Sequence, residues 1–249
     1  MAPDRLLLIS SGLLVLQLAN VCASKYKPIR TKLMDWTPQS SELHNFLFRG
    51  NQPINGTQFA YTSLVTTMRS LAKSAGHDFP DNFTLLDVSY LNVFEEKDYM
   101  VEKKFFEANP NKGTLYNKII VGSLIPPPQN DLTLTKDTVK AYVENGFDKL
   151  PEKMKFFRDL LYTKGDRPIV IYGHCEAGTD RTGEVSGAYY MKYLNLTFTE
   201  ALYINNHIQN RDMYKASRNA MQWYCFYLRF VEQFNHLSCM LPNNGTHLQ

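Results

Sequence analysis

A short apolar run followed directly by a glycine-containing loop constrains this chain more than any other feature. Residues 168–172 read Pro-Ile-Val-Ile-Tyr, a pattern typical of a buried parallel strand. Residues 174–183 read His-Cys-Glu-Ala-Gly-Thr-Asp-Arg-Thr-Gly, and residues 184–194 can continue as a helix. A loop of this kind directs successive backbone N–H groups inward, and the helix after it adds the positive end of its dipole. The order strand, loop, helix therefore predicts a binding site for a phosphate-like anion.

Two side chains give that predicted site its chemistry. Cys175 and Arg181 have five residues between them, so a curled loop places the Cys175 sulfur beneath phosphorus while the Arg181 guanidinium holds two equatorial oxygens. The inward N–H groups, Arg181 and the helix terminus all stabilise the thiolate, which is the attacking form. Gly178 permits a positive φ and a close approach to the ligand, and Thr182 offers a hydroxyl to Cys175 or to the helix start. We expect phosphate to be bound by Glu176, Ala177, Gly178, Thr179, Asp180 and Arg181.

The rest of the chain alternates between strand patterns and helix patterns. Further strands are predicted at 84–91 and 118–124, and charges in the helix predicted at 95–107 are expected on a solvated face. The alternation favours a parallel, twisted sheet covered on both faces, with ligand bound beyond the carboxyl ends of its strands. The other predicted helices lie at 57–75, near 139–143, at 152–162, after a capping box at Thr197–Glu200, and at 221–237.

The string from His174 to Gly183 resembles the signature of the protein tyrosine phosphatase superfamily of cysteine-dependent phosphatases. A looser likeness to atypical dual-specificity phosphatases begins at residues 47–53, Leu-Phe-Arg-Gly-Asn-Gln-Pro. The resemblance implies an α/β fold with a central twisted, mainly parallel sheet flanked by helices. It also implies a phosphocysteine intermediate with no cofactor and no metal, and a His174 that orients the loop and tunes the cysteine. The alternative, a buried inert cysteine beside an unrelated arginine, leaves the flanking His, Gly and Thr residues unexplained.

In this superfamily a long loop before the cysteine strand carries the general acid. Residues 129–151 form such a connection here, and a connection of this length is expected to be functional or mobile. Asp148 is our first choice for the acid, because it lies just before the helix that leads to the Cys175 strand. Asp131 and Asp137 share the connection and stay open as alternatives, and each of these residues could equally be an ordinary turn or cap residue.

The loop sequence leaves the substrate open. Asp180 resembles its counterpart in myotubularin-like and bacterial phosphoinositide phosphatases, and Cys175 to Gly178 resembles the secreted cysteine phytases, but Thr179 stands where the first group often has Lys. Protein phosphotyrosine or mixed-specificity hydrolysis is the first expectation, and hydrolysis of a phosphoinositide or inositol phosphate is the second. A pseudophosphatase that binds phosphorylated ligands without turnover is the third.

The charge of the chain gives no argument for nucleic acid as a partner, because the formal net charge is only +3 and there are no long runs of like charge.

The amino-terminal residues predict a secretory signal peptide. Arg5 precedes an apolar stretch from Leu6 to Ala19, and Val21-Cys22-Ala23 supplies small residues before cleavage at Ser24. An uncleaved signal anchor is the alternative, although the stretch is short for a span of about 20 residues. We expect a signal at 1–23 and one phosphatase domain at 24–249, without a transmembrane segment after cleavage.

The signal peptide implies the extracellular space or the lumen of the secretory pathway, and the cysteines and glycosylation sequons agree with that location. Removing the signal leaves Cys175, Cys225 and Cys239, so a free nucleophile at Cys175 leaves the other two as a possible disulfide. The alternative is that both are buried apolar residues. Asn-x-Ser/Thr sequons, which predict a glycoprotein, stand at Asn55, Asn82, Asn195 and Asn244.

Overall fold

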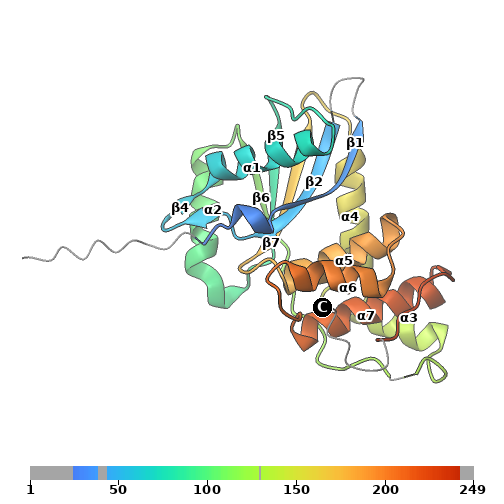
Figure 1. Ribbon diagram of the computed structural model, residues 1–249. Coiled ribbons are helices and arrows are strands. Elements are labelled where there is room, and N and C mark those ends of the chain that lie inside the picture. The colour runs from blue at the N-terminus through green and yellow to red at the C-terminus, as the bar shows by residue number, and fades with distance from the viewer. Residues whose placement is uncertain (1–24, 39–43, 129, 242–249) are drawn as a thin grey trace, which may run out of the picture.

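A five-stranded sheet forms the centre of the computed structural model, which describes residues 25–38, 44–128 and 130–241 (Figure 1). The strand order is β1-β2-β7-β5-β6. Edge strand β1 is antiparallel to β2, and the other neighbouring strands pair in parallel, which confirms the predicted fold class. The strands are β1 Lys32–Pro38, β2 His44–Asn51, β5 Thr84–Ser89, β6 Gly113–Asn117 and β7 Ile169–Cys175, with a small hairpin of β3 Ile54–Asn55 and β4 Gln58–Phe59.

Helices cover both faces of this sheet, because its central strands bury side chains in both directions (Figure 1). On β2, Phe46 and Phe48 join the core cluster beneath α1 and α2, whereas Leu47 between them joins the cluster on the opposite face. The second cluster contains side chains of α3 to α7. The helices are α1 Tyr61–Ser74, α2 Glu96–Ala108, α3 Lys136–Asn145, α4 Leu150–Tyr162, α5 Arg181–Tyr193, α6 Phe198–His207 and α7 Lys215–Phe230, with short 3₁₀ turns η1 Pro28–Arg30 and η2 Val93–Glu95.

The prediction of a strand at 118–124 was wrong. Strand β6 lies earlier, at Gly113–Asn117, and its parallel pairing with β5 ends where Ser89 meets Asn117. Beyond that point the chain leaves the sheet and runs to α7, where the Ser123 amide donates to the Ala216 carbonyl at 2.9 Å. Ile120 is buried in the core, but Val121 and Leu124 are largely exposed, so the run forms a partly covered loop and not a buried strand.

Two features that the sequence indicated near the carboxyl-terminal helices are present in the structure. Thr197 and Glu200 form the predicted reciprocal cap at the start of α6. Cys225 on α7 is joined to Cys239 by a disulfide with a Cα–Cα distance of 5.6 Å, whereas Cys175 is a free, buried thiol.

The residues of the predicted signal peptide and Asn244 lie outside the described residues. Within 25–38, 44–128 and 130–241, none of the helices combines the length and apolar character that a membrane span requires.

Candidate active site

Cys175 ends β7, and the chain then curls through residues 176–180 into the first turn of α5. The side chain is 1% exposed, and the Gly178 amide donates to its Sγ at 3.3 Å. Gly178 has φ +80°, and a Cβ there would lie 2.8 Å from the Gly50 carbonyl oxygen. Only glycine satisfies both the left-handed backbone and this close approach, so β2 and the loop together place an N–H group on the sulfur.

The loop has further donors to offer an anion. Within the described part of the chain, the backbone N–H groups of Glu176, Ala177, Thr179 and Asp180 have no hydrogen-bond acceptor. The first turn of α5 begins directly after them, and the amides of a helix's first turn lack intrahelical partners. A cysteine sulfur therefore lies beside a curved set of unpaired amides at the positive end of a helix dipole, which suits a phosphate dianion.

Arg181 is held beside this loop by a carboxylate that the sequence analysis missed. Its Nη1 and Nη2 donate to the two oxygens of Glu95 at 2.5 and 2.7 Å, and Nη1 also donates to the Tyr90 carbonyl at 3.0 Å. Burial opposes ionisation of Glu95, but hydrogen bonds from Arg181 and the Asn92 amide outweigh it and hold its pKa below the usual range. The spacing of Asn92 and Glu95, which form a capping box, was the one available signal.

Two further arginines tie the loop to the rest of the fold. Arg49 on β2 is 1% exposed, and it donates to the Gly178 carbonyl, to Ser186 Oγ at 2.6 Å and to Asn205 Oδ1. Arg211, just before α7, grips both oxygens of Asp180 at 3.0 and 2.6 Å. These charge-assisted hydrogen bonds, buried at Arg49 and partly buried at Arg211, fix the loop conformation before any ligand arrives.

Several predicted phosphate-binding residues direct their side chains elsewhere. Thr179 Oγ1 donates to Gln209 Oε1 at 3.0 Å, Asp180 faces Arg211, and Glu176 is half-exposed beside Lys25. The loop therefore presents its backbone amides, and not these side chains, to a ligand. Thr182 Oγ1 donates to the Gly50 carbonyl at 3.4 Å, which ties the start of α5 to β2.

His174 lies behind the loop in a fully buried group of charges. Its Nε2 is 3.0 Å from Asp87 Oδ1 and 3.7 Å from Glu102 Oε1, and all three side chains are 0% exposed. Burial opposes the charge on His174, but the two carboxylates outweigh it and raise its pKa. Burial also raises the pKa of Glu102, against the effect of the His174 charge. The prediction that the charges of 95–107 are solvated was wrong for Glu95 and Glu102, because both turn inward.

The ligand atoms of Asp87, Glu102 and His174 lie within 4.8 Å of one another, close enough for a metal ion to bridge. The distance of 3.0 Å between His174 Nε2 and Asp87 Oδ1 is that of a direct ion pair. We therefore assign this group as a charge network that supports the Cys175 loop from below.

Asp148 lies against the loop that follows β6. Its Oδ1 accepts from the Val121 amide and its Oδ2 from the Gly122 amide, each at 2.7 Å, and the residue is 7% exposed. Glu184 on α5 lies beside it, and burial together with the Asp148 charge raises the pKa of Glu184.

The structure thus brings Cys175 and Arg181 onto one loop, while the carboxylate of Asp148 anchors residues 121–122 to the fold. The other candidate acids are also accounted for: Asp131 pairs with Arg229 at 2.6 Å, and Asp137 lies exposed in the first turn of α3. Within the described residues, none of these carboxylates forms a hydrogen bond or ion pair with residues 175–181.

Comparisons with known proteins add little to this geometry. No protein-family model and no curated protein matches the sequence. A mutant form of Tk-PTP is 13% identical over 80% of this chain and 97% of its own, with a TM-score of 0.37. The core catalytic domain of the PP-IP phosphatase SIW14 from S. cerevisiae is 13% identical over 76% and 84%, at 0.38. Human DUSP28 is 13% identical over 76% and 91%, at 0.33. Likenesses this weak carry no argument about function, which rests on the site itself.

Proposed function

We propose that the protein is a cysteine-dependent phosphatase of the protein tyrosine phosphatase superfamily, hydrolysing phosphate monoesters. The observation that carries the proposal is the Cys175 sulfur, which receives an N–H from Gly178 on a loop with unpaired amides. The amides and Arg181 stabilise charge on the transferring phosphoryl group, which is a largely electrostatic task.

The reaction has two steps. In the first, the Cys175 thiolate attacks phosphorus, the P–O bond of the ester breaks, and the leaving alkoxide or phenoxide takes a proton from a general acid. In the second, water attacks the phosphocysteine and gives a proton to the conjugate base of that general acid, the S–P bond breaks, and inorganic phosphate leaves with the thiolate restored. The fixed guanidinium of Arg181 can hold two equatorial oxygens throughout both steps.

Asp148 remains our candidate for the general acid. It is supported by its place in the long connection and by its contact with Glu184, which lies one turn along α5 from Arg181. To reach a leaving group, its carboxylate has to release the amides of Val121 and Gly122. Movement of the loop that follows β6 is therefore part of this assignment.

Phosphorylated protein and phosphorylated inositol compounds are the two substrate classes under the proposal. The sequence favours protein phosphotyrosine or mixed specificity, with a phosphoinositide or inositol phosphate as the alternative. A pseudophosphatase that only binds its ligand is the third candidate, and it is disfavoured because Cys175 and Arg181 are both present.

We also propose that the protein is secreted as a glycoprotein that begins near Ser24. The Cys225–Cys239 disulfide supports an oxidising compartment. Asn82 and Asn195 are exposed, as glycan attachment requires, and so is Asn55. Intact-mass measurement after expression in a eukaryotic host tests both the cleavage point and the glycans.

Turnover of a chromogenic aryl phosphate under reducing conditions tests the reaction. Wild-type protein should release phosphate, whereas Cys175→Ser should bind phosphate with no turnover above background. Phosphotyrosine peptides, phosphoinositides and inositol hexakisphosphate, assayed side by side, then rank the substrate classes. Phosphate binding without turnover by the wild-type protein would identify a pseudophosphatase.

A further inference from the structure

A cavity of about 570 Å³ lies between α3, the start of α4, α7 and the chain at residues 122–125. Figure 1 shows α3 beside α7, which are two of its walls. The volume is within the range of about 300–1,000 Å³ that is typical of small-molecule sites. We call this space the α3–α7 cavity.

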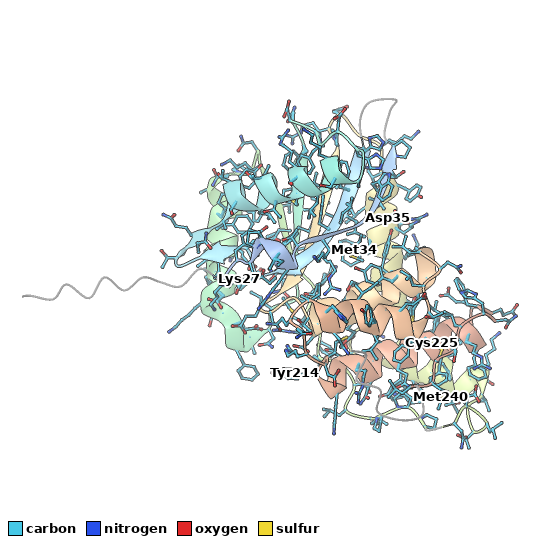
Figure 2. The ribbon with its side chains drawn as sticks, viewed as in Figure 1. Lys27, Met34, Asp35, Tyr214, Cys225 and Met240 are labelled. Carbon is cyan, nitrogen blue, oxygen red and sulfur yellow. A yellow bond between two sulfur atoms is a disulfide. The ribbon has the colours of Figure 1, made fainter. Side chains whose placement is uncertain are left out.

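The α3–α7 cavity is separate from the Cys175 loop. Figure 2 shows Tyr214, whose amide donates to Asp180 in that loop, at the start of α7, and Cys225 farther along the helix. Ala220 and Trp223, which line the cavity, come between these two positions in the chain. Among the residues that the structure describes, none of 175–181 lines the cavity. A ligand bound there does not occupy the phosphate site.

The aromatic part of the wall presents carbon to the cavity, because its polar atoms are already used. The Tyr142 and Trp223 rings stack with their centroids 4.2 Å apart. The Tyr142 hydroxyl is hydrogen-bonded to Ser123 Oγ at 2.5 Å, and Trp223 Nε1 donates to the Ile125 carbonyl at 2.9 Å. An apolar ligand against these rings therefore leaves none of these polar atoms without a partner.

Exposed apolar side chains gather on the same cavity. Leu124, Ile125 and Phe147 all line it, and they are 90%, 60% and 67% exposed. Large apolar residues normally cover a core, so a concentration of uncovered ones marks an interaction site. Phe147 makes no ring contact with the other described residues. A flat aromatic ligand gains a stacking partner in this ring.

The charges in the wall favour an acidic group on that ligand. Asp148 lines the cavity, but its carboxylate already accepts from the Val121 and Gly122 amides, each at 2.7 Å. Lys149 also lines the cavity, and its ammonium donates only to the uncharged Glu144 carbonyl, without an ion pair among the described residues. An ammonium has three N–H donors, so the charge left to be paired in the wall is positive.

The wall also contains the hydrogen bond that has to break before Asp148 can act as a general acid. Asp148 and Gly122 both line the cavity, and the bond between them closes this part of the wall. A ligand that packs against both residues binds the closed wall better than the broken one. It therefore shifts the equilibrium against release of Asp148.

We propose that the α3–α7 cavity binds a small, flat aromatic acid and that its occupation slows turnover by keeping Asp148 on the Val121 and Gly122 amides. The binding itself is independent of catalysis. The effect on turnover rests on the proposed function and on Asp148 as its general acid.

Fluorescence titration of the wild-type protein with 8-anilinonaphthalene-1-sulfonate tests the binding. Excess inorganic phosphate keeps the sulfonate off the Cys175 loop. We expect saturable binding at one site per chain. Lys149→Met should weaken it about 10-fold or more, because the sulfonate loses a charged donor. The uncharged probe N-phenyl-1-naphthylamine has the same rings, and its affinity should not change in Lys149→Met.

Lys97→Met is the control for the position of the site. Lys97 is an exposed lysine in the wall of another cavity, of about 780 Å³, between β4 and α2. It should bind both probes as the wild-type protein does. Weaker sulfonate binding in Lys97→Met with unchanged binding in Lys149→Met would overturn the α3–α7 site.

A second pair of variants fills the cavity instead of changing its charge. Ala141 on α3 lines the cavity and is exposed, so Ala141→Trp adds an indole there without entering the core, and should abolish binding of both probes. Lys140→Trp is the control, because Lys140 is the exposed neighbour outside the lining, and it should bind normally. Equal binding by the two tryptophan variants, or no binding by the wild-type protein, would overturn the site.

Turnover by the wild-type protein separates the binding site from its effect on catalysis. The sulfonate should lower kcat for a phosphotyrosine peptide several-fold more than kcat for nitrophenyl phosphate, whose leaving group needs less help from an acid. The same probe should have no effect on Ala141→Trp. Binding that leaves both kcat values unchanged overturns the link to Asp148. Absence of turnover without the probe overturns the phosphatase, whereas the titration still decides whether the site exists.

Discussion

Glu95 and Arg181, 86 residues apart in sequence, form a two-pronged ion pair at the edge of the Cys175 loop, with N···O distances of 2.5 and 2.7 Å. The pair is mostly buried, so solvent screens it weakly. Both oxygens of the Glu95 carboxylate accept from the planar Arg181 guanidinium, so the ion pair fixes the orientation of the guanidinium plane relative to the loop.

Replacing Glu95 with Gln should lower kcat/KM about 10-fold to 100-fold, because Arg181 loses one charged acceptor and its fixed orientation, at a cost of about 1.5–3 kcal/mol. Steady-state kinetics with an aryl phosphate measures the change. Glu96→Gln is the matched control, since Glu96 is the exposed neighbour in the chain. Similar kinetics for Glu95→Gln and Glu96→Gln would show that Arg181 holds its position without this partner.

Asp148→Asn should slow hydrolysis of phosphotyrosine or an alkyl phosphate about 10²–10⁴-fold, because these poor leaving groups need a positioned proton. Hydrolysis of nitrophenyl phosphate should fall much less, and the basic limb of the pH profile should disappear. The same variant should lose about 1–3 kcal/mol of stability, since an amide cannot accept from both the Val121 and Gly122 N–H groups. The measurements are kcat for each substrate and urea unfolding.

Asp131→Asn and Asp137→Asn serve as internal controls for the acid. If either shows the leaving-group dependence and Asp148→Asn does not, the acid assignment moves while the Cys175 mechanism stands. If Asp148→Asn slows both substrates equally, its role is to anchor the loop after β6.

Arg49→Met should lower the free energy of unfolding by about 3 kcal/mol or more, because it leaves the Gly178 carbonyl, Ser186 and Asn205 without a buried charged donor. Urea unfolding measures the loss. Arg69→Met is the control, since Arg69 pairs with Asp81 on the surface and such pairs contribute about 0–1 kcal/mol. Comparable losses in the two variants would mean that Arg49 does not brace the loop.

Stability should fall as the pH rises from about 6.5 to about 9. Burial lowers the pKa of His174, but Asp87 and Glu102 outweigh it and raise the value to about 9, against about 6.5 for an unfolded histidine. A folded-state pKa above the unfolded one gives stability that is fully present below about pH 6.5 and lost as the pH passes through about 9. Urea unfolding across this window measures the slope.

His174→Gln should change that slope, because it removes a titrating group and also the charge that opposes the raised pKa of Glu102. The exposed His207 provides the matched control, and His207→Gln should retain the wild-type slope. An unchanged slope in His174→Gln would place the pH dependence on other groups.

The sequence by itself determined the features that depend on near neighbours in the chain. The apolar run before Cys175, the glycine in its loop and the helix after it are local signals, and the structure forms each of them. The Thr197–Glu200 capping box is local in the same sense. Alternation of strands and helices was enough for the fold class, because parallel strands require crossover connections.

Only the tertiary structure decided which distant groups meet. No motif indicated the partners of Glu95, Glu102 and Arg49, and each acquires its role from a partner on another element. The apolar run at 118–124 was misread for the same reason, since sequence reports how apolar a segment is but not whether anything covers it. Burial and pairing are set by the packing of elements far apart in the chain, so the phosphate loop can be predicted from ten residues, whereas its charge partners cannot.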